Sequence, residues 1–394
     1  MQAQVPPPRA LRMTPAMVTL FAFCCGAIVA NLYYAQPIIE LIGPDIGLSP
    51  TAASLTVSLT QIGYAIGLFF IVPLADLVEN RRLLIATTML SVVSLAIATV
   101  VSDPGIFLFV SLLIGFGSVS VQILVPLAAH FAPDDARGRV VGNVMGGLML
   151  GILLSRPFSS FVADHFGWHA VFGTATVLMI GIALLLAVLM PRRQPDHEAS
   201  YTALLGSLFT LVARLPALRR RSFYQGCMFA SFSLFWTTAP LELSRHFDYS
   251  QSQIAVFALI GALGAIAAPI AGRLADAGHT RAGSSVAMTL AAVGFWPVAM
   301  APSLGVAGMI LTGVLLDFCV QMNMVLGQRE IYALDAASRG RLNALYVTSV
   351  FIGGAVGSLI ASPLYARFSW TGVVVVGSVL PVIALVRFVA AGMR

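Results

Sequence analysis

Charged residues are scarce in this chain of 394 residues. Its 22 basic and 16 acidic residues make up 10% of the sequence, whereas a soluble protein of this length carries about 25%, or roughly 100 charged residues. So few charges could not cover the surface of a water-soluble globule. Soluble enzymes, nucleic-acid-binding proteins and disordered chains are therefore disfavoured.

Lysine is absent, since all the basic residues are arginines. The lysine that holds phosphates in a P-loop is therefore missing, which excludes an ATP-driven pump of that type within this chain. The four cysteines lie inside apolar runs, so we expect free thiols and no disulfide framework. The chain also lacks the His-Glu-x-x-His and Gly-x-Ser-x-Gly motifs. We expect no cofactor and no metal, and energy from an ion gradient or the substrate gradient.

Apolar residues make up 58% of the sequence, and they are gathered into long runs. A helix that crosses a bilayer needs about 20 apolar residues. The runs predict an all-α integral membrane protein with twelve transmembrane helices. The predicted segments are 16–39, 51–75, 83–102, 105–130, 139–164, 168–190, 222–243, 252–272, 283–302, 304–328, 341–366 and 370–391.

The arginines predict the orientation of these segments. If the N-terminus is cytoplasmic, 19 of the 22 arginines fall on the cytoplasmic side. Only Arg245 and Arg367 fall outside, and Arg156 falls within a helix. This distribution follows the positive-inside rule, so we expect both termini in the cytoplasm.

An internal repeat divides the chain. The stretch Arg137–Trp168 aligns without gaps to Arg339–Trp370, and Leu74–Asp76 matches Leu274–Asp276 at nearly the same offset. We therefore expect two pseudo-symmetric six-helix bundles joined by a cytoplasmic linker. The expected divisions are residues 1–190, 191–221 and 222–394.

Glycines spaced by four residues occur in the corresponding segments of the repeat, in which Gly151 matches Gly353. Gly147 and Gly151 lie in the fifth segment, and Gly353 and Gly357 lie in the eleventh. This spacing places each pair on one helix face, where two backbones can approach closely in lipid. These faces either pack the helices statically or allow the two halves to slide or rock against each other. The two interpretations are compatible.

The connection between the second and third segments carries a charged motif. Val72–Arg82 contains an aspartate followed by two arginines, and Gly272–Arg281 repeats the pattern after the eighth segment. With twelve segments and two repeated halves, these loops resemble the major facilitator superfamily over essentially the whole chain. The motifs Ala30–Pro37, Leu316–Gln321 and Ile331–Leu334 resemble a bacterial branch close to the drug–proton antiporters.

The resemblance implies a central cavity lined by the first, fourth, seventh and tenth helices. The polar or aromatic candidates for contact with substrate are Asn31, Tyr34, Gln36, Gln122, Trp236, Gln321 and Asn323. Gln122 and Gln321 are equivalent in the repeat, which suggests a pair near the membrane middle, where such folds bind substrate. Alternatively, each amide ties two helices together by a hydrogen bond that contributes about 0.6 kcal/mol.

Two charged residues are expected inside the membrane. An ionised Asp317 near a helix centre costs at least about 2.5 kcal/mol, so it should be paired, hydrated or protonated. It is either a proton-coupling carboxyl or a structural partner. Arg156 keeps its proton and must find carboxylate, carbonyl or water oxygen atoms. It could bind an anionic substrate group, close the outer gate by pairing with Asp164, Glu40 or Asp317, or extend to the interface.

Further charges lie at the cytoplasmic helix ends. By resemblance, contacts of Asp76 with Arg81 and Arg82, and of Asp276 with Arg281, hold the cytoplasmic gate shut. Helix N-termini also attract carboxylates. Alternatively, these charges only reflect the cytoplasmic excess of arginine.

These features predict a secondary transporter of the inner membrane of a bacterium, not an enzyme. The favoured function is proton-coupled export of small organic molecules or drugs by antiport. The alternative is an uptake symporter or facilitator of a small metabolite or organic anion. A lipid-processing membrane enzyme is a remote alternative, because no nucleophile, base or metal cluster appears. The expected partners are a small molecule, a proton and the bilayer, with no nucleic acid, and we expect a monomer.

Overall fold

The structure is a computed structural model that describes residues 14–133, 136–195, 200–296, 304–335 and 338–392. Within these ranges every regular element is a helix, and no strand is present. The end of the predicted ninth segment, residues 297–302, lies outside the described residues.

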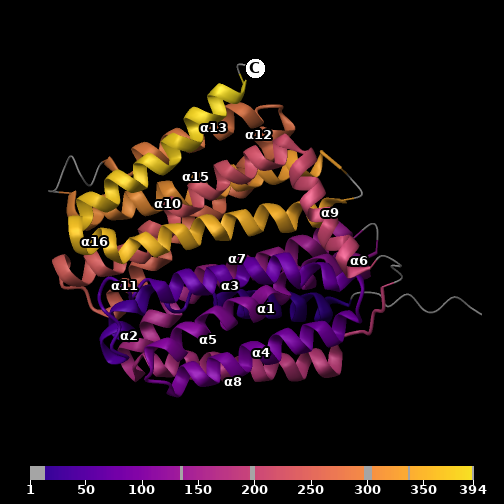
Figure 1. The fold of residues 1–394 in the computed structure, drawn as a ribbon, viewed down its shortest axis with the longest axis horizontal. Coiled ribbons are helices and arrows are strands. Elements are labelled where there is room, and N and C mark those ends of the chain that lie inside the picture. Colours follow the sequence, from indigo (N-terminus) through magenta and orange to yellow (C-terminus); the bar gives the residue numbers. More distant parts are fainter. Residues whose placement is uncertain (1–13, 134–135, 196–199, 297–303, 336–337, 393–394) are drawn as a thin grey trace, which may run out of the picture.

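The first helices follow one another with short connections (Figure 1). Their bounds are α1 Pro15–Ala30, η1 Gln36–Ile38, α2 Ile39–Asp45, α3 Leu55–Phe70, η2 Val72–Asp76, α4 Asn80–Val100, α5 Pro104–Gly117, η3 Ser118–Ser120, α6 Val121–Phe131, α7 Arg137–Phe166 and α8 Trp168–Leu189.

The first two of the remaining helices, α9 and α10, begin within the predicted linker. Their bounds are α9 Tyr201–Arg214, α10 Pro216–Phe247, α11 Gln251–Ala258, η4 Leu259–Ile266, α12 Ala267–Asp276, α13 Thr280–Val293, α15 Gly305–Tyr332 and α16 Arg339–Gly392. Helix α16 is interrupted at Ser369, whose φ of 52° is not helical.

The first predicted segment, 16–39, is not one continuous helix. Helix α1 ends at Ala30, and the amides of Asn31, Leu32 and Tyr33 each donate to a carbonyl three residues earlier. This tighter winding continues into η1, where Pro37 has no amide hydrogen to donate. The winding places Tyr33 and Gln36 in the protein interior.

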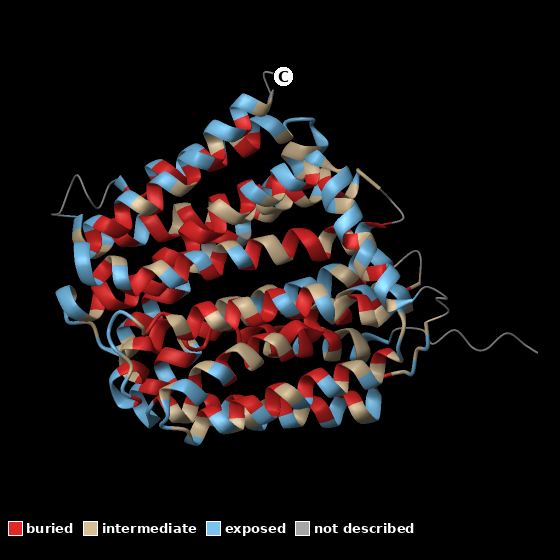
Figure 2. Ribbon diagram, viewed as in Figure 1, coloured by how far each residue is buried: buried red, intermediate tan, exposed pale blue. Residues whose placement is uncertain are grey.

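Seven helices among the described residues are long and apolar enough to cross a membrane, and an eighth is obtained if α9 and α10 form one bent span. The predicted number of twelve stays a prediction. Exposed side chains on the outer helices are strongly apolar, as Val177, Leu184 and Val188 on one face of α8 illustrate. Figure 2 shows buried residues concentrated where helices face one another. The chain therefore has the surface of a protein surrounded by lipid.

Helices α1 to α8 lie together, and α10 to α16 form the other side of the molecule (Figure 1). The end of the molecule that carries α2 and α11 is called the α2 end, and the opposite end, which carries α6 and α9, is called the α9 end. The predicted division at 191–221 remains a prediction. Within this stretch α9 is bent by 89° from α10.

Helix α9 touches both sides of the molecule. The hydroxyl of Tyr201 donates to the carbonyl oxygen of Phe70 at 2.8 Å, and the Arg341 guanidinium donates to the Ser207 hydroxyl at 2.8 Å. The connection between the two groups of helices is therefore anchored to α3 and to α16.

Repeat-related glycines make the same close contact twice. Gly151 of α7 packs against the backbone of Gly26 in α1, and Gly353 of α16 packs against Gly226 in α10. In both places an added Cβ would collide with backbone atoms of the facing helix. Corresponding helix pairs are therefore packed alike in the two groups, as the sequence repeat predicts.

The close contact at Gly151 predicts that an added methyl group lowers stability there but not at Gly142. We expect Gly151→Ala to lower the free energy of unfolding by about 1–3 kcal/mol, because the facing backbone cannot yield. Gly142→Ala on the same helix is the control, since nothing lies within 4 Å of the added atom, and we expect it to be neutral or stabilising. Thermal unfolding in detergent compares the variants. Equal stability of the two variants would contradict the packing argument.

Candidate functional site

A cavity of about 820 Å³ lies between the two groups of helices. It extends from Arg156 and Asp317 to Arg339 and Gly340, which are exposed at the α9 end. Most of its wall is apolar, with amides from Gln122, Gln321, Gln328 and Asn343. Such a size and lining are typical of sites for drug-sized molecules.

The predicted site residues divide between the wall and the layer behind it. Gln122, Gln321, Arg156 and Asp317 line the cavity. The side-chain amide of Gln122 donates to the Tyr64 hydroxyl at 3.1 Å. The two repeat-equivalent glutamines thus share one cavity.

Three other candidates are buried and do not line the cavity. The Asn323 amide nitrogen donates to Gln225 at 2.7 Å, which ties α15 to α10. The ring of Tyr34 packs against Phe158, with 5.8 Å between the ring centroids. Asn31 is also buried, and its amide nitrogen has no hydrogen-bond partner among the described residues.

Arg156 of α7 is only 4% exposed, although its charge is permanent. The guanidinium carbon lies 5.0 Å, 5.4 Å and 4.6 Å from the ring centroids of Tyr33, Phe232 and Trp236. These three rings are called the aromatic cage. The Arg156 Nε donates to Gln36 Oε1 at 2.8 Å. Arg156 therefore connects α7 to η1 and α10.

The cage does not satisfy the whole guanidinium. Nη2 of Arg156 is buried and has no hydrogen-bond partner among the described residues. In that part of the chain no ion pair joins Arg156 to Asp164, Glu40 or Asp317; Asp164 accepts from Ser252, and Glu40 pairs with Arg245. The expected pairings of Arg156 are absent from this conformation.

Asp317 of α15 lies at the N–H edge of the Trp236 indole. The indole Nε1 of Trp236 donates to Asp317 Oδ1 at 2.7 Å. Gly261 of η4 faces the second carboxylate oxygen so closely that a Cβ there would collide with it. Trp236 thus stacks on the guanidinium with its ring face and hydrogen-bonds to the carboxylate with its N–H edge.

Polar contacts close the cavity at the α2 end. The amide nitrogen of Gln36 donates to the Thr237 hydroxyl at 3.2 Å, and that of Gln61 donates to the Ser233 hydroxyl at 2.8 Å. The Ser233 hydroxyl also lies 2.7 Å from that of Ser358. These contacts connect η1 and α3 to α10 and α16. They are called the inner closure.

Charged residues form a second layer nearer the surface of the α2 end. Arg245 pairs with Glu40 at 2.5 Å. The carboxylate of Glu242 accepts from the Tyr365 hydroxyl at 2.6 Å and lies 3.0 Å from the His246 ring. This set, with the contact between Ser252 and Asp164, is called the outer closure. The described conformation is therefore closed at the α2 end.

The charges predicted to form the cytoplasmic gate lie near the α9 end. Asp276 pairs with Arg329 of α15, and Arg281 lies at the start of α13. Asp76 is exposed and forms no hydrogen bond or ion pair with any described residue. The remaining contacts are Arg82 with Glu79 at 3.0 Å and Arg81 with the carbonyl oxygen of Met190 at 3.4 Å.

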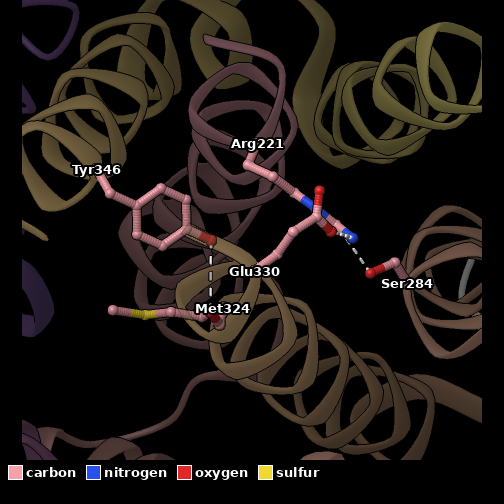
Figure 3. Close-up of polar contacts among 5 residues, drawn as sticks. All are labelled: Arg221, Ser284, Met324, Glu330 and Tyr346. Atoms are coloured by element: carbon pink, nitrogen blue, oxygen red, sulfur yellow. Dashed lines mark hydrogen bonds and ion pairs between the residues drawn. The ribbon is translucent and has the colours of Figure 1, made fainter. Parts of the chain in front are cut away.

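A buried arginine near the α9 end joins three helices, and a neighbouring hydrogen bond adds a fourth (Figure 3). The Arg221 Nε of α10 donates to Glu330 of α15 at 2.8 Å, and Nη1 donates to the Ser284 hydroxyl of α13 at 2.8 Å. Beside them the Tyr346 hydroxyl of α16 donates to the Met324 carbonyl oxygen at 3.4 Å. Sequence reasoning counted Arg221 only as a topology signal and did not identify Glu330.

Sequence reasoning also missed most of the inner closure. Serine and threonine in apolar helices usually donate to their own backbone, as Thr238 does to the Leu234 carbonyl oxygen at 2.8 Å. A pattern of hydroxyls therefore does not reveal which of them bridge two helices. Glu242 could have been found, because a carboxylate four residues before His246 favours a pair on one helix face.

Comparison with known proteins decides the family. The sequence profile of the Major Facilitator Superfamily matches residues 18–324 and 221–393. The chain belongs to the Major Facilitator Superfamily. It is similar to "Uncharacterized transporter YgaY" of Escherichia coli O157:H7, with 38% identity over 375 residues that cover 95% of both chains.

A second relative and two solved structures agree with this assignment. "Probable transporter SCO4007" of Streptomyces coelicolor is 32% identical over 90% of this chain and 82% of its own. The nucleoside transporter NupG has a TM-score of 0.73 at 13% identity, covering 95% of this chain and 99% of its own. A D-xylose–proton symporter has a TM-score of 0.69 at 15% identity, covering 94% and 96%. These structures share the fold, and this chain is a membrane transporter, not an enzyme.

The outer closure predicts a change in access at the α2 end. Thr237→Cys introduces a nearly isosteric thiol on the cavity side of the outer closure. We expect a membrane-impermeant thiol reagent, added from the α2 end, to react a few times faster when Arg245→Gln is also present. Partly exposed pairs contribute about 0.2–1 kcal/mol, which changes a population by at most about fivefold.

Arg367→Gln is the matched control, since it removes an exposed arginine from the same end that forms no ion pair with any described residue. Equal labelling rates in the Arg245 and Arg367 variants would show that the pair with Glu40 does not close this end.

Proposed function

We propose that this protein is a proton-coupled transporter of small organic molecules that works by alternating access. The observation that carries the proposal is the carboxylate of Asp317, which lines the cavity and receives a hydrogen bond from Trp236. A carboxylate in this position can hold a proton in one state and lose it in another. The same cavity offers space for a drug-sized substrate.

The cost of burial supports a protonation cycle. A charged residue near the bilayer middle costs at least about 2.5 kcal/mol, and one hydrogen bond to a charged group returns about 1.5–3 kcal/mol. For Asp317 the cost of burying the charge and the gain from the hydrogen bond are therefore nearly equal. A small change in its surroundings, such as substrate arriving or one end closing, is therefore enough to change its protonation.

Alternating access is supported by the unequal ends of the cavity. The inner and outer closures join the two groups of helices at the α2 end, whereas the cavity reaches exposed residues at the α9 end. In the proposed cycle residues 1–190 and 222–394 rock against each other, and each group is held together by its own glycine packing. By the arginine distribution the α9 end faces the cytoplasm, so the described conformation faces inward.

The charge of the substrate decides the direction of coupling. A substrate that binds more tightly when Asp317 is ionised is exchanged for protons, which is the export by antiport that the sequence favours. A substrate that binds more tightly when Asp317 is protonated travels with the proton. This second candidate, symport of an organic anion, is favoured by the guanidinium of Arg156, whose Nη2 has no partner among the described residues.

Asp317→Asn tests the proposal in reconstituted liposomes that contain a pH-sensitive dye. We expect lipophilic cations, antibiotics or organic acids from a panel to cause proton movement with the unaltered protein. The Asp317→Asn variant should still exchange labelled substrate across the membrane but move no protons, because it has no carboxyl to titrate at this position.

Asp103→Asn is the matched control. Asp103 is exposed and caps α5 through the amide of Ile106 at 2.8 Å, and asparagine is an equally good N-cap residue. Substrate-dependent proton movement of normal size in the Asp317→Asn variant would refute the assigned role of Asp317.

A further inference from the structure

We propose that the cavity binds organic anions, with the substrate's carboxylate on Arg156 and its apolar body along the cavity wall. This inference rests on the proposed function and adds the class of substrate. It starts from the guanidinium of Arg156, which the protein buries without giving it an anionic partner among the described residues.

The aromatic cage lowers the cost of this burial but does not remove it. Stacking on a ring stabilises a cation. The rings do not, however, supply oxygen acceptors for the five N–H donors of a guanidinium. The Gln36 oxygen accepts from Nε, and Nη2 has no acceptor among the described residues. Arg156 lines the cavity, so a small movement of the guanidinium toward the cavity would let a ligand there supply the missing acceptor.

A carboxylate is the group that this arrangement fits. The planar guanidinium presents parallel donors that match the two oxygens of a carboxylate. Neutral carbonyl oxygens could accept one hydrogen bond, but they would leave the charge uncompensated. A cationic group would be repelled by Arg156, and Asp317 is already engaged by Trp236.

The charged residues of the cavity wall also favour binding of an anion. Among the described lining residues, Arg156 and Arg339 are positive and Asp317 is negative. Arg339 lies at the exposed mouth, where a second positive charge attracts anions into the cavity. The remaining wall is mainly apolar, which fits an aromatic or aliphatic body better than a sugar.

Protonation of Asp317 should strengthen anion binding. The ionisable groups that interact electrostatically with Asp317 are Arg156 of α7 and Tyr33 after α1, and Trp236 of α10 donates to it, while Gly261 and Gly264 of η4 face it. When Asp317 gains a proton, the site changes from neutral to singly positive. By linkage, the anion favours protonation to the same extent, so proton and anion are carried together.

The test measures binding of two charge series to the full chain in lipid nanodiscs by calorimetry. The first series is 1-naphthoate, 1-naphthamide and 1-naphthylmethylammonium, and the second is octanoate, octanamide and octylammonium. Within each series the body is nearly constant and the charge changes. We expect the carboxylate to bind about 10- to 100-fold more tightly than the amide, the range for hydrogen bonds to charged groups.

Substitutions then locate the charge preference. Arg156→Gln should abolish it, Arg156→Lys should keep part of it, and the exposed Arg367→Gln should leave it unchanged. Asp317→Asn should retain the preference and remove the stronger carboxylate binding at acidic pH. An unchanged preference in Arg156→Gln would overturn the inference. The inference would also be overturned if the carboxylates bound no more tightly than the amides or the ammonium compounds. A dissociation constant of about 1 mM or weaker for the carboxylates would overturn it as well.

The outcome is separable from that of the proposed function. Carboxylate binding at Arg156 without any proton movement would leave this inference standing and contradict proton coupling. Proton movement driven only by cationic compounds would support the coupling and refute the anion site.

Discussion

The arrangement of the cavity depends on one constraint, which is that a guanidinium cannot lose its proton and must be accommodated as a cation inside the membrane. The chain surrounds Arg156 with three rings and the Gln36 amide and places Asp317 at the N–H edge of one of these rings, Trp236. A direct ion pair would have satisfied both charges and left the site inert. Because no ion pair joins Arg156 to Asp317 among the described residues, each charge can respond to a ligand or a proton, although their fields still interact.

The same residues connect the charges to the state of the α2 end. Gln36 accepts from Arg156 through its oxygen and donates through its nitrogen to Thr237 of the inner closure. Any movement that separates η1 from α10 therefore removes one contact of the guanidinium. Conversely, a ligand that draws Arg156 toward the cavity would weaken the hold of Gln36 on Thr237. Binding and closure are thus linked through a single amide side chain, whose two polar atoms are both in use.

The sequence was sufficient for the membrane character, the repeat and the family, because hydropathy and glycine spacing are properties of local stretches. It also indicated Arg156, Asp317, Gln122 and Gln321, all of which line the cavity, since polar groups in apolar helices are conspicuous. It could not predict which partners they find. The pairing of Asp276 with Arg329 and the buried contact of Arg221 with Glu330 both depend on tertiary contacts. Their residues resemble ordinary polar or cytoplasmic positions when read along the chain.

The most direct measurement of the central claim is a cryo-electron microscopy map of the protein in nanodiscs with saturating 1-naphthoate. The account predicts density for the carboxylate within hydrogen-bonding distance of Arg156 Nη2, the naphthyl ring along the apolar wall, and an intact contact between Trp236 and Asp317. A map in which the ligand avoids Arg156, or in which Arg156 forms an ion pair with a carboxylate of its own chain while the ligand lies elsewhere, would contradict it.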